Sequence, residues 1–283
     1  MRDQIVRKET QVVLSDRGER YARSWLPPSP SRVMILIHGY AEHAGRYDEM
    51  AMYFAERGFA VHAYDQAGHG RTAGPRGHVD RFDRLPEEVA RFAALVGQRH
   101  PGLPITLVGH SMGGLVVAAT CVDHAPPVDR VVLSGALLEL GGGGLRQTLS
   151  LWVARVLSVV APKVGFSAGL DPQGISRDPE VVRRYVADPY VKDRMSARFA
   201  AGMNAAVARA RAGASRVERP MLVLHGGLDR MTSPAGSHAF HAGLAGPVAA
   251  HSALKIYPDL RHEIFNEPER EAVWQDVLDW LDT

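Results

Sequence analysis

With 283 residues, 46% of them hydrophobic and 23% charged, the chain has an ordinary globular composition and enough length for one large α/β domain with an insertion. This composition excludes a chain that is mainly disordered or coiled coil. The 33 Lys and Arg residues nearly balance the 31 Asp and Glu residues, and a net charge of +2 is too small for the basic surface that nucleic-acid binding requires, so we expect no nucleic-acid partner.

The N-terminal segment, residues 1–19, alternates charged residues with short apolar runs. It lacks the apolar stretch of roughly 7–15 residues that a signal peptide needs. No window of the sequence approaches the ~18 consecutive apolar residues of a spanning helix. We therefore expect a cytoplasmic protein, for which any membrane contact is peripheral.

Six short apolar runs, most of them followed by Gly or polar residues, are typical of strands buried on both faces. They are residues 33–37, 60–64, 105–108, 131–133, 221–224 and 253–257. Helical patterns lie between or after several of them, at residues 46–57, 87–100, 112–124 and 269–281. The order predicts a mostly parallel sheet flanked by helices, with ligand chemistry at the carboxyl ends of the strands.

The strand spacing breaks between Leu133 and Met221, which predicts an insertion, here called the cap, at residues 139–208 within a core of residues 1–138 and 209–283. The cap begins with a glycine run, residues 141–144, and continues into an amphipathic helix that Pro162 ends. At 100° per residue, the apolar side chains of this helix share one arc. They are Leu145, Leu149, Trp152, Val153, Val156, Leu157, Val159 and Val160.

Two interpretations of this arc differ in what covers it. Packing on the rest of the molecule is the simpler one, because one apolar stripe is what any docked helix needs. The alternative is that the arc lines a lipid tunnel or contacts a membrane. Between positions 141 and 210 there are ten Lys and Arg residues and five acidic residues, a net positive charge that would favour anionic lipid.

Residues 109–113 read Gly-His-Ser-Met-Gly and match the GxSxG pattern between a predicted strand and a predicted helix. In that context the pattern predicts a sharp turn that exposes Ser111 as a nucleophile, with flanking glycines because side chains would clash across the turn. Two backbone N–H groups are expected to form the oxyanion hole. They belong to Met112, directly after the serine, and to Tyr40, in the loop after residues 33–37.

A serine nucleophile needs a histidine base, and the histidine needs an acid that orients it. In α/β-hydrolases these residues follow in the order Ser, Asp or Glu, His. Asp229 follows the predicted strand 221–224, and His262 follows the strand 253–257, so we predict these two as acid and base.

Four other residues compete for these roles. Asp65 precedes the serine and is better explained as the anchor of its own turn, and Asp259 as a loop carboxylate. His110 and His225 are better explained by packing or hydrogen bonding.

The sequence lacks the patterns of the common metal and cofactor sites. A single cysteine, Cys121, excludes a disulfide framework and a CxxC zinc site. HExxH and GxGxxG patterns in a suitable context are absent, so we expect no metal and no cofactor.

Several longer segments make the chain resemble α/β-hydrolases of the monoacylglycerol lipase and lysophospholipase-like branch, of the serine aminopeptidase S33 type. They are HGYAEHAGRY at 38–47, YDQAGHGRTAGPRGHVDRFD at 64–83, GHSMGG at 109–114, SRDPEVVRRYVADPYV at 176–191, HGGLDRMTS at 225–233 and YPDLRHEIFNE at 257–267. The resemblance covers nearly the whole chain. It implies an α/β-hydrolase fold with a helical cap over the serine.

The resemblance also implies residue roles and an activity. Ser111, Asp229 and His262 take the triad positions, and Tyr40 and Met112 the oxyanion hole. Glu42, Arg46 and Tyr185 match positions at the polar, glycerol-holding end of the pocket, although Glu42 and Arg46 would also fit a pair that only braces the loop. Tyr40 stands where the family usually carries a smaller residue, which would narrow the pocket.

The implied activity is cleavage of lipid-type carboxylic esters, above all of monoacylglycerols to fatty acid and glycerol, through an acyl-enzyme on Ser111. A broader carboxylesterase, a thioesterase or a lysophospholipase is the alternative, because the motifs do not select the leaving group. A ligand receptor on the same fold is the non-enzymatic alternative, and it would predict a broken triad. The expected partner is a small lipid ester, with peripheral membrane contact through the cap.

Overall fold

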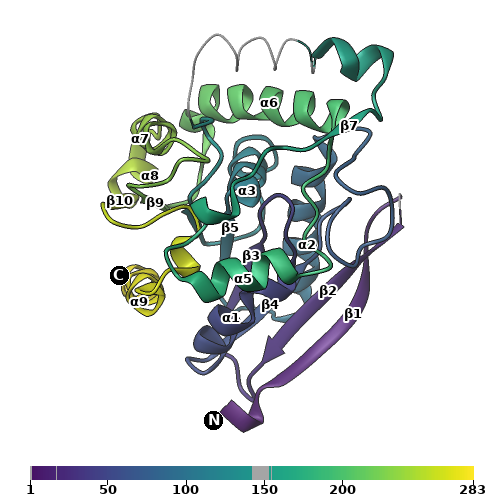
Figure 1. Cartoon of the computed structure of the whole chain (residues 1–283). Helices are drawn as coiled ribbons and strands as arrows, with labels where there is room; N and C mark the ends of the chain where they lie inside the picture. Colours follow the sequence, from purple (N-terminus) through teal and green to yellow (C-terminus); the bar gives the residue numbers. More distant parts are fainter. Residues whose placement is uncertain (1, 17, 142–152, 154) are drawn as a thin grey trace.

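The computed structural model describes residues 2–16, 18–141, 153 and 155–283 (Figure 1). Within this part of the chain, eight strands form one sheet in the order β1-β2-β4-β3-β5-β6-β9-β10. Their bounds are β1 Val6–Ser15, β2 Gly18–Leu26, β3 Arg32–Ile37, β4 Phe59–Tyr64, β5 Ile105–His110, β6 Arg130–Ser134, β9 Met221–Gly226 and β10 Ala253–Tyr257. All pairs from β4 to β10 are parallel, whereas β2 is antiparallel to both of its neighbours.

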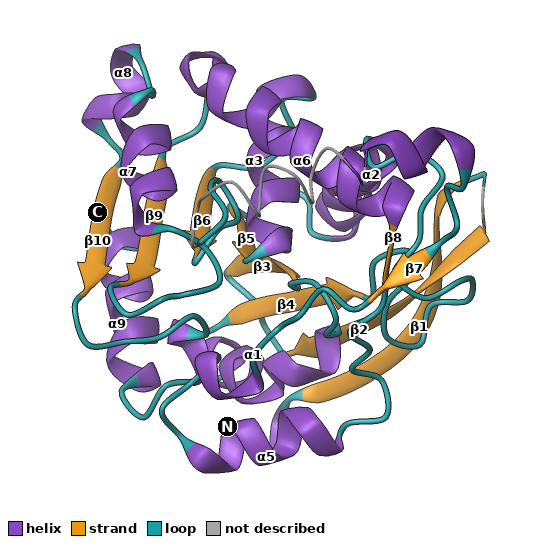
Figure 2. Ribbon diagram, turned by 45° about the horizontal axis from the view of Figure 1, so that its top comes forward, coloured by secondary structure: helices purple, strands orange, loops and turns teal. Residues whose placement is uncertain are grey.

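Helices cover both faces of the sheet, as Figure 2 shows. The bounds are α1 Asp48–Ala55, α2 Arg84–Arg99, α3 Met112–Asp123, α5 Pro179–Ala187, α6 Ala197–Ala212, α7 Pro234–Ala242, α8 Gly246–Ala250 and α9 Arg270–Leu281. One apolar core joins α2, α3 and α6 to one face, and a second joins α1 and α9 to the other. This sandwich leaves the carboxyl ends of the parallel strands as the edge where loops from distant parts of the chain meet.

The six predicted strands are all present, and the predicted fold class, a mostly parallel sheet flanked by helices, is confirmed. The β1–β2 hairpin was not predicted. Strand β1 lies at the edge of the sheet, where Val6 and Val13 remain 59% and 52% exposed. A half-exposed edge strand lacks the continuous apolar run that marks the central strands.

The chain between β6 and β9 carries α5, α6 and a two-stranded sheet of β7 (Gly165–Phe166) and β8 (Met195–Ser196). The predicted cap boundary after residue 208 falls within α6. Of the predicted amphipathic helix, Leu145, Leu149 and Trp152 lie outside the described residues, while residues 155–160 are helical.

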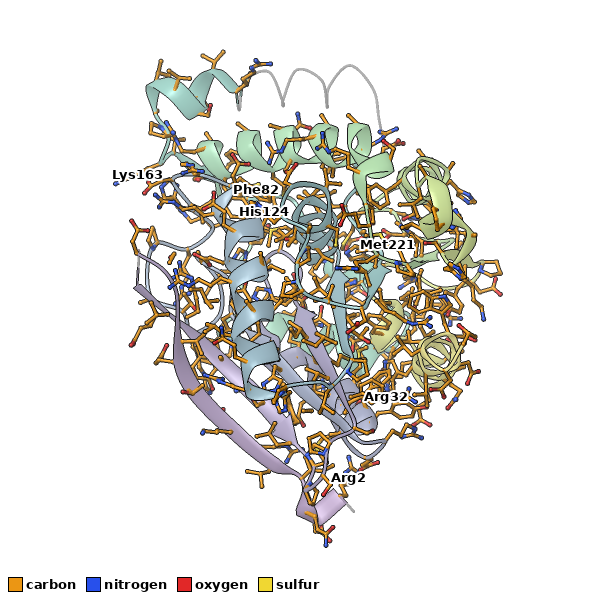
Figure 3. The ribbon with its side chains drawn as sticks, turned by 180° about the vertical axis from the view of Figure 1, so that it is seen from behind. Arg2, Arg32, Phe82, His124, Lys163 and Met221 are labelled. Atoms are coloured by element: carbon orange, nitrogen blue, oxygen red, sulfur yellow. The ribbon has the colours of Figure 1, made fainter. Side chains whose placement is uncertain are left out.

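Four valines of the apolar arc face outward, whereas Leu157 is half-buried. Val153, Val156, Val159 and Val160 are 41% to 75% exposed, so the expectation that the arc packs on the rest of the molecule is wrong for these residues. In Figure 3 this helix lies at the top of the view, and Lys163, three residues after it, lies below it at the left edge. Among the described residues, no helix has the length and apolar character needed to cross a bilayer.

A buried ion pair fastens the N-terminal hairpin to the rest of the core. Arg20 of β2 donates from Nε to Glu88 Oε2 of α2 at 2.9 Å, and from Nη2 to Glu88 Oε1 at 2.5 Å. The two side chains are 5% and 1% exposed. Removing one partner would leave an uncompensated charge in a place that water does not reach.

Glu88→Ala should therefore lower the free energy of unfolding by about 3–5 kcal/mol, measured by urea denaturation. Glu180→Ala, which breaks an exposed pair with Arg183 on α5, is the matched control and should cost less than about 1 kcal/mol. Arg20→Met combined with Glu88→Leu should recover most of the loss, because no charge remains buried. Equal losses in all three variants would contradict this account.

Candidate active site

Ser111 lies in a sharp turn between β5 and α3, with φ 54° and ψ −120°. This backbone conformation is strained for a residue with a side chain. A Cβ on Gly109 would lie 2.6 Å from the Gly113 carbonyl oxygen, and a Cβ on Gly113 only 2.2 Å from the Ile37 carbonyl oxygen. The close approach of β3, β5 and α3 therefore requires glycine on both sides of the serine, as the motif predicted.

The structure brings the three predicted triad residues together from three strand ends. Ser111 Oγ lies 2.9 Å from His262 Nε2, and His262 Nδ1 lies 2.7 Å from Asp229 Oδ2. The carboxylate can only accept at Nδ1, so the neutral ring carries its proton there. Its Nε2 lone pair is then free to accept the hydroxyl proton of Ser111, the arrangement that general-base catalysis needs.

Asp229 is buried, but its carboxylate is surrounded by donors. The backbone N–H groups of Met231 and Thr232 donate to Oδ1 at 2.8 and 3.0 Å, and the Thr232 hydroxyl donates to Oδ2 at 2.7 Å. Burial alone would raise the pKa of Asp229. The charge of His262 and hydrogen bonds from His225 and His262 outweigh burial and hold this pKa well below its usual range, so the acid stays ionised.

The pKa of the predicted base, His262, is shifted in the opposite direction. Burial would lower the pKa of His262, but Asp229, then Glu263 and Glu42, stabilise its protonated form and raise the pKa above its usual value. The ring of His110 packs against His262 with centroids 4.8 Å apart. Burial, followed by repulsion from His262, lowers the pKa of His110 to about 3, so His110 is a neutral packing partner at neutral pH.

The two predicted oxyanion donors flank Ser111. Met112 N–H is the first amide of α3 and has no acceptor within the helix. Tyr40 follows Gly39, whose N–H donates to Glu42 Oε1 at 2.6 Å and thereby orients the loop after β3. Tyr40 and Met112 both line the cavity beside Ser111. The Tyr40 ring packs against His69 and, across to the cap, against Phe199 of α6.

Glu42, Arg46 and Glu263 form a buried ion cluster next to His262. Arg46 Nη1 donates to Glu42 Oε2 at 2.8 Å and to Glu263 Oε1 at 2.6 Å, and Nη2 donates to Glu263 Oε2 at 2.8 Å. The guanidinium also stacks 4.7 Å from the ring centroid of Tyr185, the predicted cap residue. Burial would raise the pKa of Glu263, but Arg46 lowers it to about 2.

This cluster refines the three predicted substrate contacts. Glu42 and Tyr185 line the same cavity as Ser111, whereas Arg46 lines a neighbouring cavity between α1 and α5. The geometry favours the bracing interpretation for Arg46, because two carboxylates already hold its guanidinium. Glu263 was missed by the sequence analysis, although it directly follows the predicted base. Thr232, three residues after Asp229, was missed as well.

The cavity in front of Ser111 measures about 230 Å³ and is mainly apolar. Its apolar wall comes from the core and the cap, and includes Leu137, Leu140, Phe166, Leu170, Met195, Met203 and Val207. Its charged wall is formed by Glu42 and Glu263, and no Lys or Arg of the described chain lines it. The predicted nucleophile, Ser111, thus opens into an apolar cavity with a polar, acidic end.

The two competing acids lie away from this series of hydrogen bonds, whereas His110 and His225 contact His262 and Asp229. Asp65 accepts hydrogen bonds from the backbone of Ala44 at 2.8 Å and of Arg71 at 2.7 Å, which fits the predicted turn anchor. Asp259 is an exposed loop residue. In the described part of the chain, no group of three or more His, Cys, Asp or Glu residues is arranged to hold a metal ion.

Comparison with known proteins gives consistent matches over the chain. The family model described as serine aminopeptidase, S33, matches residues 28–269. A monoacylglycerol lipase of Mycolicibacterium smegmatis is 38% identical over 91% of this chain and 90% of its own. The phospholipase YtpA of Bacillus subtilis is 30% identical over 89% of this chain and 95% of its own. The crystal structure of a monoacylglycerol lipase of Paleococcus ferrophilus superposes with a TM-score of 0.82 at 31% identity, covering 93% of this chain and 98% of the other.

The electrostatics of His262 predict the acid limb of the pH profile. The ring must be neutral to take a proton, so kcat/KM for a water-soluble ester should fall as the pH drops through the pKa of His262. Because that pKa is raised, the midpoint should lie above 6.5. Glu263→Gln removes a neighbouring negative charge and should move the midpoint to lower pH. A wild-type midpoint below 6.5, or an unmoved limb in the variant, would contradict this assignment.

Proposed function

We propose that this chain, which belongs to the serine aminopeptidase S33 family of α/β-hydrolases, cleaves monoacylglycerols to fatty acid and glycerol through an acyl-enzyme on Ser111. The chain is a serine ester hydrolase of the monoacylglycerol lipase-like type. The observation that carries the proposal is the hydrogen-bonded series from Asp229 through His262 to Ser111, which opens into an apolar cavity with an acidic, polar end.

In acylation, Ser111 Oγ attacks the ester carbonyl carbon while His262 Nε2 takes the hydroxyl proton. The carbonyl oxygen becomes an oxyanion that accepts hydrogen bonds from the N–H groups of Met112 and Tyr40. When the tetrahedral intermediate collapses, the C–O bond to the alcohol breaks, and the imidazolium returns its proton to the leaving oxygen. The ionised Asp229 stabilises the imidazolium throughout.

Deacylation repeats these steps with water as the nucleophile. His262 takes one proton from the water as its oxygen attacks the acyl carbon, and returns that proton to Ser111 Oγ when the acyl–enzyme bond breaks. The products are the fatty acid and a regenerated serine. This cycle uses the same base twice, and its net reaction consumes one ester and one water molecule.

The charge of the cavity favours a neutral leaving group. Two carboxylates, Glu42 and Glu263, against the one guanidinium of Arg46 leave one negative charge at the polar end. A glycerol hydroxyl can donate to such a wall, and Tyr185 lies beside it. A phosphorylated head group would meet like charge there, which costs several kcal/mol at a close contact. A lysophospholipase, which the similarity to a phospholipase raises as a second candidate, is therefore less favoured.

A matched panel of esters tests the proposal. With one medium-length acyl chain, kcat/KM should be at least about tenfold higher for the monoacylglycerol than for the lysophosphatidylglycerol, because like charge opposes the latter. Within monoacylglycerols, activity should rise from a four-carbon to a medium-length chain as the apolar wall is covered. Ser111→Ala should lower turnover by about 10⁴- to 10⁶-fold and abolish fluorophosphonate labelling.

Each outcome separates one alternative. Preference for the lysophospholipid would identify a lysophospholipase, and activity that falls steadily beyond short esters would identify a general carboxylesterase. Cleavage of an aminoacyl anilide in preference to every ester would identify a peptidase. A chain that neither labels at Ser111 nor hydrolyses any member of the panel would fit a receptor.

The exposed cap helix supports a second part of the proposal, peripheral contact with a lipid surface. Val156, Val159 and Val160 present apolar surface to solvent, and Arg155 and Lys163 beside them are exposed cations. Each such cation near an anionic leaflet contributes about 1 kcal/mol of attraction. Contact through this helix would place the cap against the lipid phase that contains the substrate.

Val159→Ser combined with Val160→Ser should lower co-sedimentation with phosphatidylglycerol vesicles severalfold, because less apolar surface enters the interface. Hydrolysis of a short water-soluble ester should not change. Val186→Ser, at a valine of α5 that is 65% exposed, is the matched control and should bind like the wild type. Equal vesicle binding by all three proteins would exclude this helix as the contact.

A further inference from the structure

A second imidazole lies on the far side of the triad carboxylate from the substrate cavity. His225, near the end of β9, is fully buried, and its Nε2 lies 3.1 Å from Asp229 Oδ2. Its other ring nitrogen, Nδ1, lies 2.7 Å from the hydroxyl of Ser237 on α7, which is equally buried. Strand β9 and helix α7 lie side by side (Figure 2), so the contact joins two elements of the core.

The surroundings of this ring select its tautomer. A lone pair on Nε2 would face both the negative charge of Asp229 Oδ2, 3.1 Å away, and the backbone carbonyl oxygen of Thr232, 3.4 Å away. The proton therefore belongs on Nε2, where both neighbours are acceptors. Nδ1 then carries the lone pair and accepts the hydroxyl proton of Ser237. The Thr232 side chain completes the surroundings, with Oγ1 3.3 Å from Nε2 and 2.7 Å from Asp229 Oδ2.

We propose that His225, with its tautomer held by Ser237, is a positioning residue for the triad: it holds Asp229 from behind and partly compensates the charge that Asp229 presents to His262. The inference rests on the proposed roles of Asp229 and His262. His225 itself touches neither Ser111 nor the cavity, so its effect reaches the reaction only through the carboxylate.

The proposal rests on the three groups that contact Asp229 Oδ2. This oxygen faces His262 Nδ1 at 2.7 Å, the Thr232 hydroxyl at 2.7 Å and His225 Nε2 at 3.1 Å. Without the third group, the carboxylate can turn, and its negative charge acts more strongly on His262. A carboxylate that turns lowers the rate at every pH. A negative charge that acts more strongly on His262 stabilises the protonated form of that ring.

Other charges around His262 do not depend on His225. Glu263 and Glu42 lie on the cavity side with Arg46 between them, and the neutral ring of His110 comes from β5. These groups remain in place when His225 is replaced. A change in the acid limb of the profile can therefore be attributed to the carboxylate at 229.

The test measures the rate of fluorophosphonate labelling at Ser111 across pH, together with kcat/KM for a soluble ester. His225→Leu should lower both rates at the plateau about tenfold, within the range for losing a hydrogen bond to a charged group, and should move the acid limb to higher pH. His225→Gln keeps an N–H donor and should restore most of the rate and the position of the limb. Ser237→Ala, a smaller change, should shift the limb in the same direction by less.

A matched control separates positioning from packing. His62 on β4 is buried like His225 and hydrogen-bonds a serine in the same way, with Nδ1 2.8 Å from Ser24 Oγ, but it lies away from the cavity. His62→Leu should affect stability and leave the pH profile unchanged. An unmoved acid limb in both His225→Leu and Ser237→Ala, or a glutamine variant no better than leucine, would overturn the inference. Failure of the wild type to label at Ser111 would instead overturn the proposed function.

Discussion

The geometry and protonation of the site depend on the hydrogen bond between His262 and Asp229. A carboxylate buried to this degree would be neutralised if burial acted alone. Here two backbone amides, a threonine hydroxyl and two imidazoles surround it, and this set of donors keeps the charge in place. Because Asp229 stays charged, His262 has a fixed tautomer, a raised pKa and a lone pair aimed at Ser111.

The opposite side of the site is organised by a second set of buried charges. Glu42 orients the peptide before the Tyr40 amide, and Arg46 ties Glu42 to Glu263, the residue after the base. The oxyanion loop and the histidine loop, more than 200 residues apart in the chain, are thus held by one guanidinium. Tyr185 of α5 packs on that guanidinium, which connects the region between β6 and β9 to both loops. Positioning of the donors and the polarity of the cavity therefore have a common structural origin.

The region between β6 and β9 has one helix that packs on the core and one whose apolar side chains face solvent. Helix α6 packs on the core through Phe199, which contacts Tyr40 and Phe82, and Figure 3 shows Phe82 beneath this helix. Residues 155–160 instead turn their valines toward solvent. Helix α6 therefore lines the cavity, whereas the helix at residues 155–160 presents an apolar surface to solvent. This division fits an esterase whose substrate is collected from an apolar phase.

Local patterns in the chain were enough to predict the sharp turn at Ser111, the six parallel strands, and the order of Ser111, Asp229 and His262 at strand ends. Each of these depends on short-range rules: glycine where a Cβ cannot fit, short apolar runs in the parallel strands, and polar residues where a parallel strand ends. The contacts of Thr232, His225 and Glu263, the β1–β2 hairpin and the outward valines of the cap helix were decided only by the fold. They depend on which segments become neighbours in space, and an apolar stripe or a lone histidine has the same sequence pattern whether its neighbour is a core, a carboxylate or solvent.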